Sequence, residues 1–124
     1  MALTVRVTQD RSISRTIHLH GRLDHDSVAA LDSELDKVAD QPVEVLIFDL
    51  ADLEYINSAG LRSIFAARNP VAEQSRRLVL VNAKPHVQKV LDVIKAVDLA
   101  AVFGSVEELD RYLDAMQRKG VDGQ

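Results

Sequence analysis

Residues 48–61 read FDLADLEYINSAGL and form the most informative junction in this 124-residue chain. The largely apolar run before it, Val43–Phe48, predicts a strand that is buried on both faces. Apolar residues at helical spacing follow from Leu61 onward and predict a helix. Asn57 and Ser58 are both favourable N-cap residues, so the junction predicts a strand, a short connection, and a helix whose N-terminus carries a hydroxyl group.

A serine at a helix N-terminus has two interpretations. Ser is an ordinary capping residue, and the residues alone favour this simple role for Ser58. The free backbone N–H groups at a helix N-terminus also favour negative charge, so the same hydroxyl could carry a phosphate without unfolding the helix.

Three blocks of sequence resemble the STAS domain family, the fold of bacterial anti-sigma factor antagonists. Asp49–Leu50 followed by Asn57–Leu61 is similar to the family signature, and Gly21–Asp24 is similar to its Gly-Arg-Leu-Asp block. Pro85–Leu113 resembles a third block, with a Pro-initiated helix, a Leu-aspartate loop and a capped last helix. The resemblance covers about Leu3 to Leu113, with the blocks in family order.

The resemblance implies a role for Ser58. The family typically has Asp-Ser-Ser/Ala-Gly-Leu at this junction, and its first Ser is the residue that a partner kinase phosphorylates. This chain has Asn57 where the family usually has Asp, so one carboxylate beside the predicted phosphorylation site is absent.

As the resemblance implies, we expect a non-enzymatic protein-binding switch in partner-switching signalling and transcription regulation. The unmodified form would bind an anti-sigma factor or serine kinase of the histidine-kinase-like ATPase type. Phosphorylation would end the interaction, and a phosphatase would restore it. We expect a monomer or weak dimer whose partner-binding residues are Asp24, Asn57, Ser58, Ala59, Leu61 and Arg62. An exposed Leu61 or Ile56 could supply an apolar contact, although core packing is the commoner fate of both.

Two other classes of function stay open. The chain could be a structural STAS subunit of a signalling scaffold or of a lipid or anion transporter complex, and Asn57 favours this alternative. An enzyme is disfavoured, because Ser58 with Asp24–Asp26 lacks the Gly-x-Ser-x-Gly elbow of hydrolases. A nucleotide or other anion site at Arg62, Arg68 and Arg76–Arg77 lacks a phosphate-binding loop.

Composition narrows these classes further. The chain contains no cysteine, which excludes disulfides, thiol catalysis and cysteine-bound metal, and no cofactor is expected. A net charge of −4 and the absence of tryptophan argue against nucleic acid as a partner. No apolar run approaches the roughly 18 residues of a membrane span, and no signal-peptide pattern is present, so we expect a cytoplasmic protein without membrane insertion.

The remaining pattern predicts one α/β domain over residues 1–118 with a disordered tail at 119–124. We expect a mixed sheet of four to five strands, with about four helices packed mainly on one side. The expected elements are a hairpin over residues 3–19 with its turn at Gln9–Arg11, a helix capped by Asp26, a buried strand at Leu78–Val81, a helix from Pro85, a short strand at Ala101–Phe103 and a last helix from Ser105.

Local signals refine the helices. Ser105 and Glu108 form a predicted capping box, and Val106, Leu109, Tyr112, Leu113 and Met116 are expected to face inward. Pro70 predicts a stop or kink near Asn69, with Val71–Ser75 as a separate turn. Gly60 is expected to let the helix start pass close to a neighbouring backbone.

His18 and His20 lie two residues apart on a predicted strand, so their side chains share one face. Such a pair can bind a metal, but no third ligand has a recognisable spacing. We therefore expect the solvated face of a partly exposed strand, with Ser14 and Thr16 on the same side.

Overall fold

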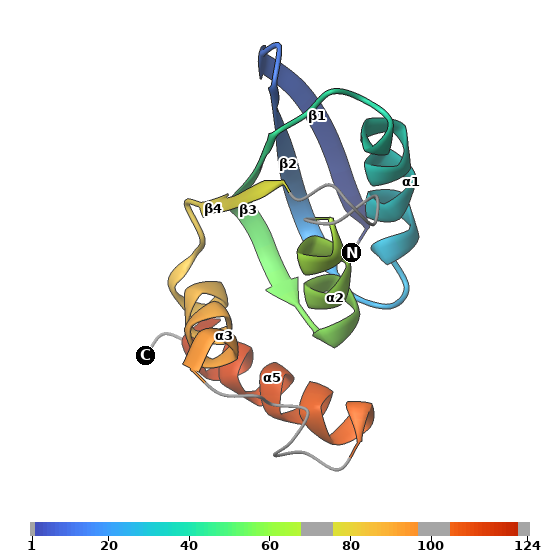
Figure 1. The fold of residues 1–124 in the computed structure, drawn as a ribbon. Helices are drawn as coiled ribbons and strands as arrows, with labels where there is room; N and C mark the ends of the chain where they lie inside the picture. Colours follow the sequence, from blue (N-terminus) through green and yellow to red (C-terminus); the bar gives the residue numbers. More distant parts are fainter. Residues whose placement is uncertain (1, 68–75, 97–104, 122–124) are drawn as a thin grey trace.

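The computed structural model describes residues 2–67, 76–96 and 105–121, and the described part has an α/β fold (Figure 1). Its elements in chain order are β1 (Leu3–Arg11), β2 (Ser14–Leu23), α1 (Val28–Ala39), β3 (Val45–Ile56), α2 (Ser58–Ala66), β4 (Arg77–Val81), α3 (Pro85–Ala96) and α5 (Val106–Val121). The helices α1 and α2 lie against one face of the sheet, while α3 and α5 pack against each other beyond the end of β3 (Figure 1).

The four described strands form one mixed sheet in the order β1-β2-β3-β4. β1 and β2 are antiparallel, whereas β2 pairs with β3, and β3 with β4, in parallel. Parallel neighbours need a crossover, and α1 and α2 supply the two crossovers. The predicted hairpin is confirmed, but β1 continues to Arg11 and the turn lies at Ser12–Ile13, later than the sequence predicts.

β3 differs from the prediction in length and in burial. The strand continues through the polar residues after Phe48 and ends only at Ile56. Leu46 and Phe48 are fully buried, whereas Val45 and Ile47 stay partly exposed. The prediction of a strand buried on both faces is therefore wrong, because the helices cover one face of this part of the sheet.

Irregular pairing lets the longer β3 keep its apolar residues in the core. His18 pairs with Asp49 but His20 pairs with Asp52, so β3 has one more residue than β2 between these pairs. An extra residue reverses the alternation of faces along a strand. As a result Leu50 and Leu53 are both fully buried.

Leucines, isoleucines and valines from the strands and all four described helices form one core. α3 begins at Pro85, as predicted, and its buried residues include Val87, Val90 and Leu91. None of the described helices is long and apolar enough to cross a membrane.

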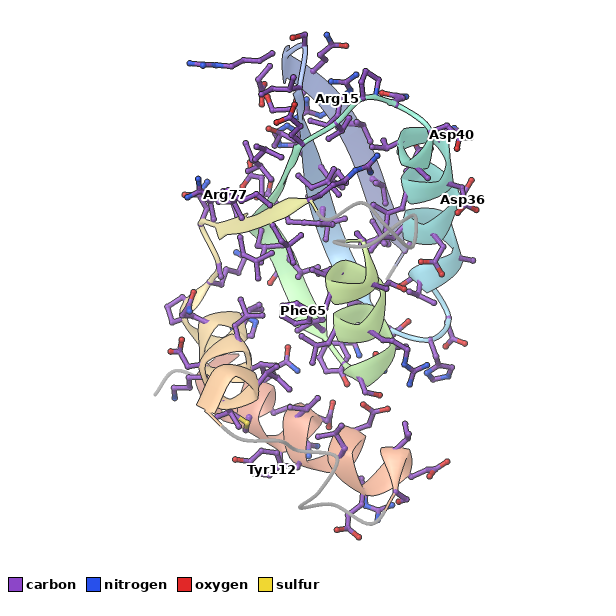
Figure 2. All side chains as sticks on the ribbon, viewed as in Figure 1. Arg15, Asp36, Asp40, Phe65, Arg77 and Tyr112 are labelled. Atoms are coloured by element: carbon purple, nitrogen blue, oxygen red, sulfur yellow. The ribbon has the colours of Figure 1, made fainter. Side chains whose placement is uncertain are left out.

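One bond of the predicted capping box of the last helix is confirmed, because the Glu108 backbone N–H donates to Ser105 Oγ at 3.1 Å. Its predicted apolar face is only partly correct. Leu113 is fully buried, but Val106 is 50% exposed and Tyr112 is 39% exposed, and Tyr112 projects from α5 on the side away from the sheet (Figure 2). α5 also continues to Val121, so the first three residues of the predicted disordered tail are helical.

Three predictions fall on residues outside the described part of the chain. They are the stop or kink near Asn69, the turn at Val71–Ser75 and the strand at Ala101–Phe103. The described helix α2 ends at Ala66, with Ala67 as its C-cap.

Candidate functional site

The candidate site lies where β3 ends and α2 begins. A single residue, Asn57, joins the strand to the helix and has an extended backbone (φ −121°, ψ −169°). Its Oδ1 accepts hydrogen bonds from the backbone N–H groups of Ala59 (3.1 Å) and Gly60 (3.4 Å). Asn57 is therefore the N-cap of α2. Its side chain accepts the capping hydrogen bonds without the negative charge that an aspartate would add there.

Ser58 is the first helical residue and is 9% exposed. Its Oγ is buried and has no hydrogen-bond partner in the described structure. Buried hydroxyl groups are normally paired, since an unpaired one loses its bond to water without compensation. Capping, which explains many helix-terminal serines, does not account for this hydroxyl, because Asn57 already performs it.

The backbone N–H of Ser58 has a partner from the far end of the chain. It donates to Oδ1 of Asp110, on α5, at 2.8 Å. The carboxylate of Asp110 thus occupies the place at the start of α2 where the free N–H groups and the helix dipole favour an anion. The sequence does not predict this role of Asp110, because an aspartate on the polar side of an amphipathic helix is usually solvated.

α5 is held in this position by Gln117, which is 2% exposed. Its side-chain Oε1 accepts from the backbone N–H of Ile56 at 2.8 Å, and its Nε2 donates to the Ile56 carbonyl at 2.6 Å. β4 pairs only with Val45–Asp49, so the later part of β3 has no strand on that side in the described ranges. The side-chain amide of Gln117 makes the two hydrogen bonds that a neighbouring strand would otherwise make there. Along the same edge, a nitrogen of His86 lies 2.6 Å from the Glu54 carbonyl oxygen.

Charged residues surround Tyr55 beside the junction. The Arg22 guanidinium carbon lies 3.9 Å from the centre of the Tyr55 ring, a cation–π contact, and Arg22 Nε lies 3.8 Å from an Asp24 carboxylate oxygen. The pKa of Tyr55 is raised, chiefly by burial and then by the negative charge of Asp114, with smaller effects of Asp110 and Asp24 and an opposing effect of Arg22. The site is therefore rich in carboxylates.

Asp24 organises the turn before α1. Its Oδ1 accepts from the backbone N–H groups of Asp26 and Ser27, and Ser27 Oγ donates to the Arg22 carbonyl at 2.7 Å. Ser27, and not Asp26, is the N-cap residue of α1, so the predicted capping role of Asp26 is wrong. The Asp26 side chain is exposed and lies 3.5 Å from the His25 ring instead.

The residues predicted to bind a partner divide into a buried and an accessible set. Leu61 and Ile56 are buried in the core, so neither offers the exposed apolar contact considered for them. Ala59 is partly exposed, and Arg62 is exposed and lines a groove of about 510 Å³ with Asp32 and Asp36 of α1.

The backbone N–H of Asn57 donates to the Leu23 carbonyl at 3.2 Å, which joins the Asp24 turn to the start of α2.

Gly60 allows close packing, but against side chains instead of the predicted backbone. A Cβ at this position would lie 2.6 Å from Leu23 Cγ and 3.0 Å from Ile56 Cγ1. The start of α2 therefore sits directly on the core at the ends of β2 and β3.

The basic residues considered as an anion site have separate roles. Arg76 is buried, and its Nη2 donates to the carbonyls of Val38, Ala39 and Gln41 at 3.0–3.2 Å. It thereby satisfies the C-terminal end of α1, where a positive charge is favourable. Burial, with a smaller effect of Arg15, lowers the pKa of Arg76. Arg77 is exposed at the edge strand (Figure 2), and Arg68 lies outside the described residues.

The two histidines of β2 differ in their surroundings. His18 is partly buried, with Nδ1 3.0 Å from Asp49 Oδ2 and Nε2 3.1 Å from Thr8 Oγ1, while His20 is exposed. Ser14 and Thr16 share their face but are buried, so only part of this face is solvated as predicted. In the described ranges no group of three or more His, Cys, Asp or Glu residues could hold a metal ion.

The sequence is similar to those of known proteins over most of its length. The model of the STAS domain family matches residues 4–109. The chain is 30% identical over 89 residues to BtrV of Bordetella bronchiseptica, provisionally named an anti-sigma factor antagonist; the match covers 72% of this chain and 77% of BtrV.

Solved structures of SpoIIAA share the fold. For the anti-sigma factor antagonist SpoIIAA in its unphosphorylated form, the TM-score is 0.66 at 20% identity, over 74% of this chain and 81% of that protein. For the Bacillus cell-fate determinant SpoIIAA in its phosphorylated form, the TM-score is 0.60 at 21% identity, over 73% and 83%. Since the family model spans most of the residues that build the sheet and the β3–α2 junction, this chain belongs to the STAS domain family.

Proposed function

We propose that this protein is a non-enzymatic switch that binds an anti-sigma factor and is released by phosphorylation at Ser58. The observation that carries the proposal is the unpaired Ser58 hydroxyl at the start of α2, inside the family-matched segment. Neither capping nor packing requires a hydroxyl there, whereas a phosphate acceptor does. The names of BtrV and SpoIIAA, and the phosphorylated form of SpoIIAA, support the same function.

The partner in this proposal is an anti-sigma factor that is also a serine kinase of the histidine-kinase-like ATPase type. It docks over the start of α2 and the Asp24 turn, where Ala59 and Arg62 are accessible. A phosphate adds a charge of about −1.5 to −2 at pH 7. A partner surface packed on this junction cannot bury such a charge without a cationic pocket, so phosphorylation ends the complex.

The site gives no support to hydrolysis. Ser58 Oγ has no base within hydrogen-bond distance in the described structure, and His25 is exposed and faces Asp26. A serine nucleophile needs a base that accepts its proton. Binding is therefore the activity that this junction supports.

Calorimetric titration with the anti-sigma kinase from the same genome tests the proposal. Unmodified protein and Ser58→Ala should bind alike, and protein phosphorylated at Ser58 should bind at least tenfold more weakly. Arg11→Ala, at the opposite end of the sheet, serves as a surface control. Equal binding of the phosphorylated and unmodified forms would reject the switch.

A structural STAS subunit is the second candidate, favoured by the neutral Asn57 and by the burial of Ser58. Mass spectrometry of the protein isolated from its own host separates the two functions. A switch carries phosphate on Ser58 in a fraction of molecules that changes with growth conditions. A structural subunit remains unmodified and co-purifies with its assembly.

A further inference from the structure

The contact between Asp110 and Ser58 has two physical consequences. The Ser58 backbone N–H is already occupied at 2.8 Å, and the Oγ beside it is buried. Phosphoryl transfer needs the attacking oxygen within about 3–3.5 Å of the phosphorus, with the two aligned. A nucleotide held by a kinase cannot reach a buried Oγ, so the chain has to open at this site before transfer.

Charge makes the closed arrangement incompatible with a phosphate on Ser58. The phosphate would seek the N–H groups at the start of α2, which is the place that the Asp110 carboxylate holds. Two anions cannot share one short helix terminus without strong repulsion.

α5 is a single helix that contacts Ser58 from the C-terminal part of the chain. It is held by the Asp110 bond, the two bonds of Gln117 to Ile56, the packing of Leu113 in the core and the packing of α5 against α3. Asp110 and Gln117 both lie beyond residues 4–109, the segment that the family model matches.

We propose that α5 is an intramolecular cover on Ser58, with Asp110 as a resident anion that the phosphate displaces. In the closed state Asp110 accepts from the Ser58 backbone N–H at the start of α2, and α5 shields the hydroxyl. Opening exposes Ser58 to the kinase, and the phosphate then prevents Asp110 from returning. The proposal rests on the proposed function in taking Ser58 as the phosphorylated residue, and it adds the regulation of that residue.

The absence of native cysteine provides a direct test without a kinase. The thiol of a Ser58→Cys variant reports opening through its rate of reaction with the disulfide reagent DTNB, measured at the high-pH plateau where the thiol is fully ionised. Ser33→Cys, at an exposed position on α1, gives the rate of an uncovered thiol. We expect the Ser58→Cys variant to react at least tenfold more slowly than the Ser33→Cys variant.

Two added substitutions should open the cover. Asp110→Asn removes the charge from a charge-assisted hydrogen bond, and Gln117→Met removes the bonds to Ile56 without changing charge; each should accelerate the reaction of the Ser58→Cys thiol by roughly 10-fold or more. Asp114→Asn is the matched control, since it changes charge on α5 but its ion pair is with Arg118. It should leave the rate within twofold.

A second measurement uses phosphoserine placed at position 58 during translation of the full chain. Hydrogen exchange of α5 should then rise roughly tenfold while α1 exchange stays constant, and Asp110→Asn should reduce the rise. The cover is overturned if the Ser58→Cys thiol reacts as fast as the Ser33→Cys thiol, or if phosphoserine leaves α5 exchange unchanged. Neither experiment uses a partner, so a failed titration with the anti-sigma kinase would reject the proposed function and leave the cover standing.

Discussion

Gln117 completes the backbone hydrogen bonding of Ile56 across 61 residues of sequence, with Oε1 accepting at 2.8 Å and Nε2 donating at 2.6 Å. The two bonds reproduce what a further strand would provide along the later part of β3, where no strand of the described ranges pairs on that side. Because Ile56 directly precedes Asn57, the same contact fixes the strand end from which α2 starts. The stability of the junction therefore depends on a residue in the last helix.

Gln117→Met should lower the free energy of unfolding by about 2–4 kcal/mol, because it leaves a buried N–H and a buried carbonyl without partners at similar side-chain volume. Urea unfolding measures the change. Gln88→Met is the control, since the exposed side chain of Gln88 donates to Asp92 on its own helix. Equal midpoints for the two variants would show that the Ile56 bonds contribute nothing.

Gly60→Ala should destabilise the protein despite the better helix propensity of alanine. The new Cβ would lie 2.6 Å from Leu23 Cγ, which is fully buried and cannot move freely. Overpacking typically costs about 1–3 kcal/mol, while replacing glycine in a helix gains at most about 1 kcal/mol. We expect a net loss of roughly 1 kcal/mol in urea unfolding, and Leu23→Ala in the same chain should cancel the clash. A stabilised single variant would contradict this packing.

Asp49 should make stability depend on pH in the acid range. The amide of Asn82 is the main cause that holds the pKa of Asp49 below its ordinary value of 3.8, with help from the Ala51 N–H and His18. A lowered pKa in the folded state stabilises the protein fully above the unfolded value, and that stability is lost as the pH falls through the folded value. The loss should begin near pH 4 and continue below it.

Asp49→Asn should therefore flatten the stability profile below about pH 4, measured by urea unfolding at steps of half a pH unit. Asp52→Asn, an exposed position three residues along β3, is the control and should keep the wild-type slope. An unchanged slope in Asp49→Asn would mean that the hydrogen bonds of this carboxylate do not contribute to the pH dependence of stability.

The sequence predicts the parts of the fold that depend on neighbouring residues. Asn57 is recognisable as a cap because capping is a local contact, and Ser105 with Glu108 is recognisable for the same reason. The parallel sheet follows from the alternation of strands and helices. The β3 segment after Phe48 was missed because its polar residues resemble a loop, and they form a strand only through pairing with β2.

The sequence predicts the β3–α2 junction as the site, but it does not predict the α5 residues that contact this junction. Asp110 and Gln117 act on residues 52 and 61 positions earlier, and only the docking of α5 brings them there. Polar residue types on an amphipathic helix give no sign of such a role, because most of them face solvent. Arg76 was missed in the same way, since its three carbonyl partners belong to the end of α1.

Substitutions of Ser58 should distinguish the effect on stability of losing the buried hydroxyl from the effect of adding a charge. Ser58→Ala removes an unpaired buried polar group, so the free energy of unfolding should stay within about 0.5 kcal/mol of wild type or rise slightly. Ser58→Asp places a second carboxylate beside Asp110. The helix dipole favours the new carboxylate by about 0.3–1 kcal/mol, but its repulsion from the partly desolvated charge of Asp110 costs more. We therefore expect the free energy of unfolding to fall by about 1–3 kcal/mol.

The double variant Ser58→Asp with Asp110→Asn decides whether that loss is electrostatic. If repulsion between the two carboxylates dominates, the double variant should be more stable than Ser58→Asp alone, although Asp110→Asn by itself weakens the bond to the Ser58 N–H. Asp114→Asn in the Ser58→Asp background should restore much less, because Asp114 makes no bond to Ser58 in the described structure and pairs with Arg118. Thermal and urea unfolding of the set measure the coupling energy. A coupling of zero between positions 58 and 110 would mean that Ser58→Asp destabilises through the size of the side chain, and that the anion position at the start of α2 is not contested.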